Sequence, residues 1–270
     1  MVPRVAHFAR IASFGSCIHI SSCRHGSDCK NETNAPVRER GLAFARRLPP
    51  LAPGCRRIYL LRHGQTDWNA RGLLQGGGFD IKLNETGRAQ GLQVAEELAA
   101  VPIGIIASSP LSRAHGTADR VKAYHPGARR VVVSTLSEMR FGGFEGAAIR
   151  GPDSTQDLAA HYERVSARMR ADTNLRWPGP SGESLAEVEV RARSAVAGIM
   201  KLYPEERHIC CVAHSRLNKI FIASQIWGDV SRQADVEQGN TCINVVDFDE
   251  EGGTWKQVLL NYVEHADLNS

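Results

Sequence analysis

The sequence predicts an α/β fold in which a mostly parallel central sheet is covered by helices on both faces. Two observations carry this prediction. Short apolar runs, which are typical of buried strands, alternate with stretches of helical periodicity throughout residues 57–270. In addition, a chain of 270 residues is long enough to bury a substantial core in one large domain.

The first half of this region is predicted to contain two helices between three strands. The first helix begins near Asn84, a favourable N-cap, and continues to Leu98 with apolar residues on one face. The second is expected to begin at Ser109 and Pro110, because proline is well suited to the first helical position. The strands are apolar or β-branched runs at residues 58–61, 103–107 and 131–136.

The second half is predicted to contain three further helices and three further strands. Residues 155–169 favour a helix, and residues 185–202 form a long amphipathic pattern that Pro204 ends. A third helix is expected over residues 217–226. The remaining strands are predicted at residues 209–213, 242–248 and 255–263.

Charge divides the chain into two parts. The net charge is +4, but residues 1–57 hold ten basic and three acidic side chains, so they carry +7 and the rest carries −3. We therefore expect residues 1–56 to be a basic, disordered leader and residues 57–270 to be the catalytic domain. The leader contains Arg and Ser but no acidic residue before Asp28, which is typical of an organelle transit segment, and an untargeted extension is the alternative. The expected location is the cytoplasm, or an organelle if the leader is a transit peptide.

Composition argues against several other classes of protein. No apolar run approaches the roughly 20 residues that span a bilayer, so no membrane association is expected. The basic excess lies in the leader, so nucleic acid is not an expected partner. Cys23, His25 and Cys29 lack the spacing of a zinc site, and the remaining histidines lack metal-binding motifs. We expect no metal and no other cofactor; the oligomeric state is left open.

Charged and polar residues follow four of the predicted strands. Arg62 and His63 follow the first strand, Arg113 the second, Glu138 the third and His214 the fourth. Ligands of parallel sheets bind beyond the carboxyl ends of the strands, so these side chains are expected to meet in one crevice. An arginine fork matches phosphate oxygens, a histidine can act as nucleophile and a carboxylic acid can carry a proton. The set predicts phosphoryl chemistry.

Five ordered blocks within residues 57–265 resemble the histidine phosphatase superfamily, which has the phosphoglycerate mutase-like fold. Single blocks are weak signals, but their shared order is specific. The blocks follow a signature at residues 61–69 (LRHGQTDWN), and they are Gln75 and Gly76 with Asp80, Leu83 and Gly87, then residues 108–114 (SSPLSRA), 138–146 (EMRFGGFEG), 182–184 (GES) and 212–214 (VAH).

The resemblance implies a role for each residue of the set. His63 would attack phosphorus and form a phosphohistidine, while Arg62, Arg113 and His214 hold the phosphoryl oxygens. Glu138 would protonate the leaving oxygen and then accept a proton from the water that hydrolyses the intermediate. Two further side chains, Thr66 and Asn69, are expected to line the phosphate pocket, and Glu145 could compete with Glu138 for the proton-transfer role.

The chain departs from the family pattern after the second histidine. Ser215 and Arg216 follow His214, where the family usually has glycine, and both are candidate substrate-binding residues. Arg216 either binds an anionic part of the substrate or points to solvent. One extra residue also lies between Gly76 and Asp80, so the loop above the site is expected to differ.

The predicted function is a metal-independent phosphatase, a phosphoric monoester hydrolase that acts on small phosphorylated metabolites. One alternative is phosphotransfer of the cofactor-dependent phosphoglycerate mutase type. Only 43 residues separate Glu138 from Gly182, whereas the mutase branch is expected to have a longer insertion. A second alternative is a non-catalytic module that binds a phosphorylated ligand. Binding alone would require neither a nucleophile nor a proton donor, so the presence of both in the sequence argues against this alternative.

Overall fold

A six-stranded sheet forms the centre of the molecule. The computed structural model describes residues 35–266, and the strand order in its sheet is β3-β2-β4-β1-β5-β6. The strands β1 to β4 pair in parallel, whereas β5 and β6 are antiparallel. Their bounds are β1 Cys55–Arg62, β2 Ile105–Ser108, β3 Arg129–Val132, β4 His208–Ala213, β5 Ile243–Asp249 and β6 Thr254–Tyr262.

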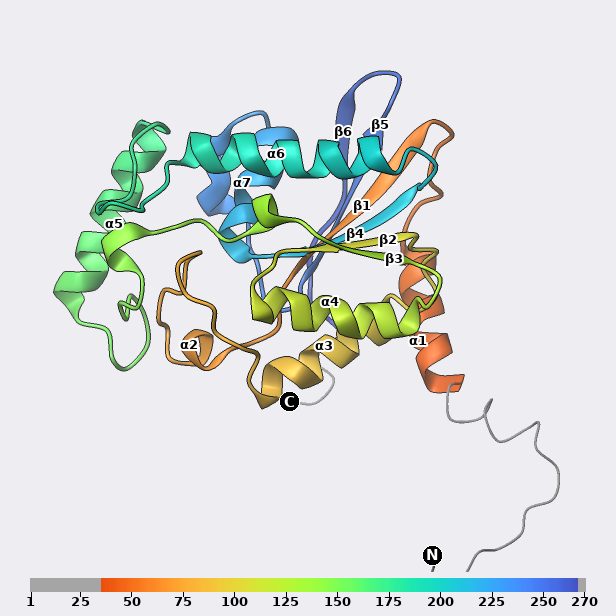
Figure 1. The fold of residues 1–270 in the computed structure, drawn as a ribbon, viewed down its shortest axis with the longest axis horizontal. Helices are drawn as coiled ribbons and strands as arrows, with labels where there is room; N and C mark the ends of the chain where they lie inside the picture. Colours follow the sequence, from red (N-terminus) through yellow and green to blue (C-terminus); the bar gives the residue numbers. More distant parts are fainter. Residues whose placement is uncertain (1–34, 267–270) are drawn as a thin grey trace, which may run out of the picture. The chain divides into compact units, whose positions relative to one another are not determined.

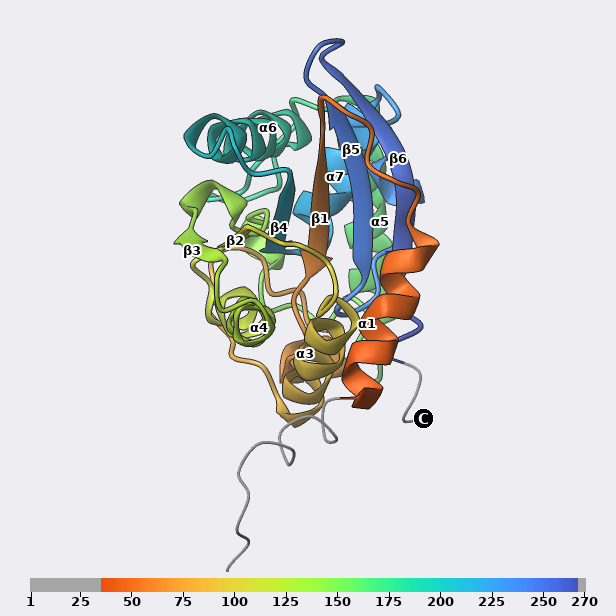
Figure 2. The same ribbon diagram turned by 90° about the vertical axis from the view of Figure 1, so that its right-hand side faces the viewer.

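Helices cover both faces of the sheet, as Figures 1 and 2 show, so the predicted fold class is confirmed. On one face α1, α3 and α4 pack against the side chains of Tyr59 and Leu61, and on the other α6 and α7 pack against Ile58 and Leu60. Alternate residues of β1 therefore point into two separate cores. The helices are α1 Ala35–Arg47, α2 Asp67–Ala70, α3 Glu85–Glu97, α4 Ser112–Tyr124, α5 Gln156–Ala171, α6 Leu185–Leu202 and α7 Ser215–Gln225.

A third apolar cluster supports the outer wall of the site. It joins α5 to the start of α6 and to the loop that follows Glu138, and Tyr162 stacks on Trp177 within it with ring centroids 5.1 Å apart. Thr155 caps α5, and Ser184 caps α6 in a reciprocal arrangement with Glu187. Figure 1 shows α5 at the end of the molecule, beyond the sheet. This placement lets residues of α5 reach a site at the carboxyl ends of the strands.

The ordered domain begins before residue 57, which corrects the predicted boundary. Residues 35–47, expected to belong to a disordered leader, form α1, and Phe44 is fully buried against Tyr262 with ring centroids 5.2 Å apart. Arg57 forms a buried ion pair with Asp247 at 2.7 Å. The helix was missed because its sequence is basic and has few apolar positions from which a period could be recognised. Residues 1–34, with Cys23, His25 and Cys29, lie outside the described residues.

Two other sequence predictions were wrong in detail. The run at 131–136 is not one strand, because β3 ends at Val132 and a single turn of 3₁₀ helix follows at Ser134–Leu136. The strand lies at the sheet edge, where half of the Val132 surface is exposed, so pairing stops early. The helix expected from Ser109 begins instead at Ser112. Among the described residues, no helix is long and apolar enough to cross a membrane.

Candidate active site

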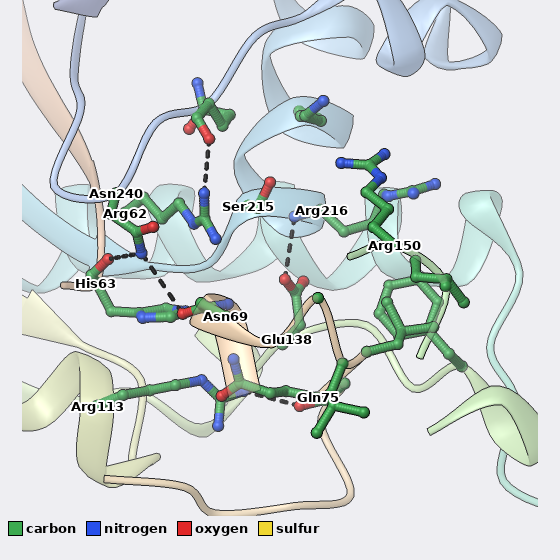
Figure 3. Close-up of a pocket in the computed structure, with 18 of the residues that line it drawn as sticks. Arg62, His63, Asn69, Gln75, Arg113, Glu138, Arg150, Ser215, Arg216 and Asn240 are labelled. Carbon is green, nitrogen blue, oxygen red and sulfur yellow. Dashed lines mark hydrogen bonds between the residues drawn. The ribbon is translucent and has the colours of Figure 1, made fainter. Parts of the chain in front are cut away.

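A cavity of about 350 Å³ lies at the carboxyl ends of β1 and β4 and is lined by most of the predicted site residues (Figure 3). Seven of the nine predicted residues line it, while His214 and Thr66 are completely buried close to it. The seven are Arg62, His63, Asn69, Arg113, Glu138, Ser215 and Arg216. The sheet therefore gathers side chains from five separate segments into one site.

His63 is held as a neutral imidazole in a fixed tautomer. Its ring nitrogen Nδ1 donates to the carbonyl oxygen of Gly64 at 2.7 Å, because a carbonyl can only accept, so the proton resides on Nδ1 and the lone pair on Nε2. Burial and the charges of Arg113 and Arg62 lower the pKa of His63 well below its ordinary value. A Cβ at position 64 would collide with the backbone of Gly87, which explains the glycine beside the histidine.

His214 lies directly against His63, with ring centroids 5.2 Å apart. It is the N-cap residue of α7 and is fully buried. Burial, followed by the charge of Arg113, lowers its pKa well below the ordinary value. Neither ring nitrogen has a hydrogen-bond partner within the part of the chain that the structure describes. Buried polar atoms are nearly always paired, so this imidazole is suited to bonding a ligand.

Within the described part of the chain, Arg62 and Arg113 bond to carbonyl groups and not to carboxylates. Arg62 donates to the Gln238 carbonyl at 2.7 Å, and Arg113 donates to the carbonyls of Gly76 and Phe79 at 2.8 and 2.9 Å. Burial lowers the pKa of both guanidinium groups, that of Arg113 to about 10, so Arg113 remains cationic at neutral pH. Because carbonyls orient these groups without neutralising them, they can attract an anion strongly.

Glu138 is fixed by the first turn of α7. Its carboxyl oxygens accept from the backbone N–H groups of Met139, Arg216 and Leu217 at 2.8 to 3.0 Å. Its competitor Glu145 does not line the cavity; instead it accepts from the backbone N–H groups of Phe141 and Gly78 and so braces the loop over the site. Of the two carboxyl groups, Glu138 is the one at the cavity.

Thr66 and Asn69 are placed differently from each other. Thr66 is fully buried, and its hydroxyl caps α2 by accepting from the backbone N–H of Asn69 at 3.2 Å. The same hydroxyl donates to the side-chain oxygen of Asn69 at 3.1 Å. Thr66, which was expected to line the pocket, therefore acts on it through Asn69, which does line it.

Arg216 lies in the cavity wall and is held by aromatic neighbours. Its guanidinium donates to the Tyr162 hydroxyl at 2.8 Å and lies over the ring of Phe141, 5.5 Å from the centroid. Of the two alternatives that the sequence left open, the structure favours an arginine directed to the site. Ser215 lines the cavity beside it.

Six polar lining residues were missed by the sequence analysis. Two of them carried a usable signal: Lys219 lies three residues after Arg216 and so shares its face of α7, and Gln75 belongs to one of the family-like blocks. The others come from loops or from α5, where the sequence has no pattern that points to the site. The six are Gln75, Arg150, Tyr162, Lys219, Gln238 and Asn240. Within residues 35–266, the structure contains no group of three or more metal-ligating side chains.

The fold and the site define the class of protein, an α/β enzyme that acts on phosphate esters. A sequence model of the histidine phosphatase superfamily (branch 1) matches residues 58–261, and the chain belongs to this family.

Similar proteins include a phosphatase and a probable mutase. The glucosyl-3-phosphoglycerate phosphatase of Mycobacterium tuberculosis is 32% identical over 169 residues, which are 60% of this chain and 71% of the relative. A solved structure of the mycobacterial glucosyl-3-phosphoglycerate phosphatase matches with a TM-score of 0.66 and 28% identity, covering 77% of this chain and 100% of the other. A probable phosphoglycerate mutase of Enterobacter sp. is 29% identical over 78% of this chain and 94% of its own length.

Proposed function

We propose that this protein is a phosphatase that hydrolyses small phosphate monoesters through a phosphohistidine at His63. The observation that carries the proposal is the neutral His63 imidazole, whose Nδ1 proton is bound by the Gly64 carbonyl at 2.7 Å and whose other nitrogen keeps its lone pair. It lines the cavity together with Arg62 and Arg113. A nucleophile with its lone pair available beside two cations suits attack on a phosphate ester.

In the first step the lone pair of His63 Nε2 forms a bond to phosphorus, and the bond between phosphorus and the ester oxygen breaks. The ester oxygen keeps the electron pair and receives a proton from Glu138. In the second step a water oxygen attacks phosphorus, Glu138 takes a proton from this water, and the bond to His63 breaks. The products are an alcohol and inorganic phosphate, and both catalytic groups return to their starting states.

The remaining site residues stabilise the transferred phosphoryl group. Arg62 and Arg113 supply guanidinium donors, and His214 supplies an imidazole N–H without a competing partner among the described residues. Phosphoryl transfer depends mainly on positioning and on stabilising charge at the equatorial oxygens. These groups can provide both, so we propose that the reaction needs no metal ion.

Phosphotransfer of the mutase type is the second candidate, because one of the relatives is a probable phosphoglycerate mutase. Hydrolysis is favoured by the short segment between Glu138 and Gly182, in which α5 is the only α-helix. A mutase must shield its phosphohistidine from water, and a longer insertion is expected to provide that shield.

The test is an assay of the full chain on an aryl phosphate, on sugar phosphates, and on 3-phosphoglycerate with 2,3-bisphosphoglycerate. We expect the wild type to release phosphate and the His63→Ala variant to release none. His115→Ala is a matched control, since this half-buried histidine on α4 lies outside the cavity. Equal release by wild type and His63→Ala would exclude His63 as the nucleophile, and isomerisation without release would favour the mutase.

We also propose that the protein is located in the cytoplasm, or in an organelle if residues 1–34, the part of the predicted leader before α1, are a transit peptide. The support is their basic, acid-poor composition. Fluorescent fusions of the full chain and of a chain lacking residues 1–34 decide between the two, because only a transit segment would change the location when it is removed.

A further inference from the structure

The cavity contains more positive charge than the phosphoryl group requires. Among the described residues, five basic side chains line it, whereas Glu138 is the only acidic one. Arg62 and Arg113 flank the nucleophile and account for the phosphoryl oxygens. The three remaining cations, Arg150, Arg216 and Lys219, have no part in the hydrolysis described above.

These three cations are not neutralised by the protein. None of them forms a salt bridge within the described residues, and Arg216 is held by the neutral groups Tyr162 and Phe141. Burial, Arg216, Arg150 and then Arg62 lower the pKa of Lys219 to about 8, and the opposing effect of Glu237 is smaller. Grouping like charges in a partly buried wall costs free energy, which an anionic ligand would offset.

Arg150 and Arg216 lie on the opposite side of Glu138 from the nucleophile, and Lys219 follows Arg216 about one turn further along α7. Figure 3 shows Arg216 and Arg150 on one side of Glu138, with His63 and Arg62 on the other. The backbone N–H of Arg216 donates to Glu138 at 3.0 Å, so this arginine adjoins the carboxyl group that is proposed to protonate the ester oxygen. A group bound by these cations therefore belongs to the part of the substrate beyond that oxygen.

We propose that Arg150, Arg216 and Lys219 form a second anion-binding subsite and that the substrate is a phosphate monoester whose alcohol part carries a further anionic group. This group is a carboxylate or a second phosphate, since guanidinium and ammonium groups bind both. The inference rests on the proposed phosphatase function and adds the class of substrate to it. Phe141 and Tyr162 position Arg216 for this contact.

The test compares two esters that differ in one group. In D-3-phosphoglycerate a carboxylate stands where sn-glycerol 1-phosphate, which has the same configuration at C2, has a neutral hydroxymethyl group. We expect kcat/KM of the wild type to be about tenfold or more higher for 3-phosphoglycerate, a difference of about 1.4 kcal/mol. A third ester, glycerol 1,3-bisphosphate, identifies the anionic group. If 3-phosphoglycerate is a better substrate than this bisphosphate, the subsite binds a carboxylate. If the bisphosphate is better, the subsite binds a second phosphate.

Arg150→Gln and Arg216→Gln should each reduce this preference about tenfold or more. The change at 216 keeps the backbone N–H that holds Glu138. Arg164→Gln is the matched control, because this arginine is exposed on α5 and lies outside the cavity. The proposed subsite would be overturned if the wild type showed no preference for the charged ester. It would also be overturned if both cavity variants retained the wild-type preference.

A binding measurement keeps the two proposals separable. Calorimetry with His63→Ala gives the affinity for D-3-phosphoglycerate and for sn-glycerol 1-phosphate without turnover. Tighter binding of the charged ester, lost when Arg216→Gln is added, supports the subsite even if the wild type releases no phosphate. Equal affinities overturn it even if the enzyme proves to be a phosphatase.

Discussion

His63 and His214 share one buried environment but differ in their hydrogen bonds. The Nδ1 atom of His63 is bound to the Gly64 carbonyl, whereas both nitrogens of His214 lack a partner among the described residues. The sequence could predict that both residues meet, because each follows a buried strand. It could not predict which nitrogen carries the proton on His63, because the tautomer depends on a carbonyl direction that appears only in the folded backbone.

Glu138 is predicted to matter most for substrates with a poor leaving group. In Glu138→Gln the first turnover of an alkyl phosphate should slow by ~10²- to 10⁴-fold, because the departing alkoxide needs a proton. With p-nitrophenyl phosphate the loss should be smaller, since nitrophenolate can leave unprotonated. Rapid-mixing burst kinetics measure both rates. Glu145→Gln should keep the wild-type ratio of the two rates, and a similar loss for both esters in Glu138→Gln would contradict the assigned role.

Lys219 gives the second subsite a dependence on pH. Its pKa of about 8 means that the ammonium charge is present below that pH and is lost above it. The charged groups that face it are Arg216, Arg150, Arg62 and Glu237.

The value of kcat/KM for D-3-phosphoglycerate should therefore fall as pH rises through about 8, relative to that for sn-glycerol 1-phosphate. Lys219→Arg should abolish this fall, because a guanidinium stays charged. A fall of the same size in Lys219→Arg would show that another group is responsible.

At the scale of elements, the first turn of α7 organises the site. It contributes His214 as N-cap, Arg216 and Lys219 as cavity cations, and two backbone N–H groups that hold Glu138. The helix was predicted from its apolar face, but two residues too short at its N-terminus. Helix periodicity identifies the buried face of an element well, whereas the direction of its first turn depends on the strand before it.

The helix α1 shows what periodicity cannot detect. Its fully buried Phe44 packs in the core beside α3 and Tyr262, although the surrounding sequence is basic. Phe44→Ala should lower the free energy of unfolding by about 3 to 5 kcal/mol, as for other large buried aromatic residues. Urea denaturation measures this change. Val190→Ala, at an exposed position of α6, should change it by less than about 0.5 kcal/mol. No loss in Phe44→Ala would mean that α1 is not part of the folded domain.

Across the whole molecule, the order of the strands determines which residues meet. Pairing of β4 with both β1 and β2 brings His214 next to His63 and Arg113, residues far apart in the chain. The rule that ligands bind at the carboxyl ends of parallel strands was sufficient to predict this part of the site. Arg150, Gln238 and Asn240 were not predictable in the same way, because irregular loops bring them to the cavity.

The charge distribution supports a reaction without metal. Five cations line the cavity, although residues 58–270 together carry a net charge of −3. Phosphate release should therefore be unchanged after incubation with EDTA, because protein cations stabilise the transferred group. The measurement is the rate before and after chelation and dialysis. A clear loss that a divalent ion restores would contradict this prediction.

The proposed mechanism of hydrolysis requires a covalent bond between phosphorus and His63. Rapid alkaline quenching during turnover, followed by mass spectrometry of peptides, detects such a phosphoramidate directly. We predict one phosphoryl group on the peptide that contains His63 and none on any peptide of the His63→Ala variant. A phosphoryl group on a different residue, or turnover at full rate with no phosphorylated peptide, would contradict a mechanism through a phosphohistidine at His63.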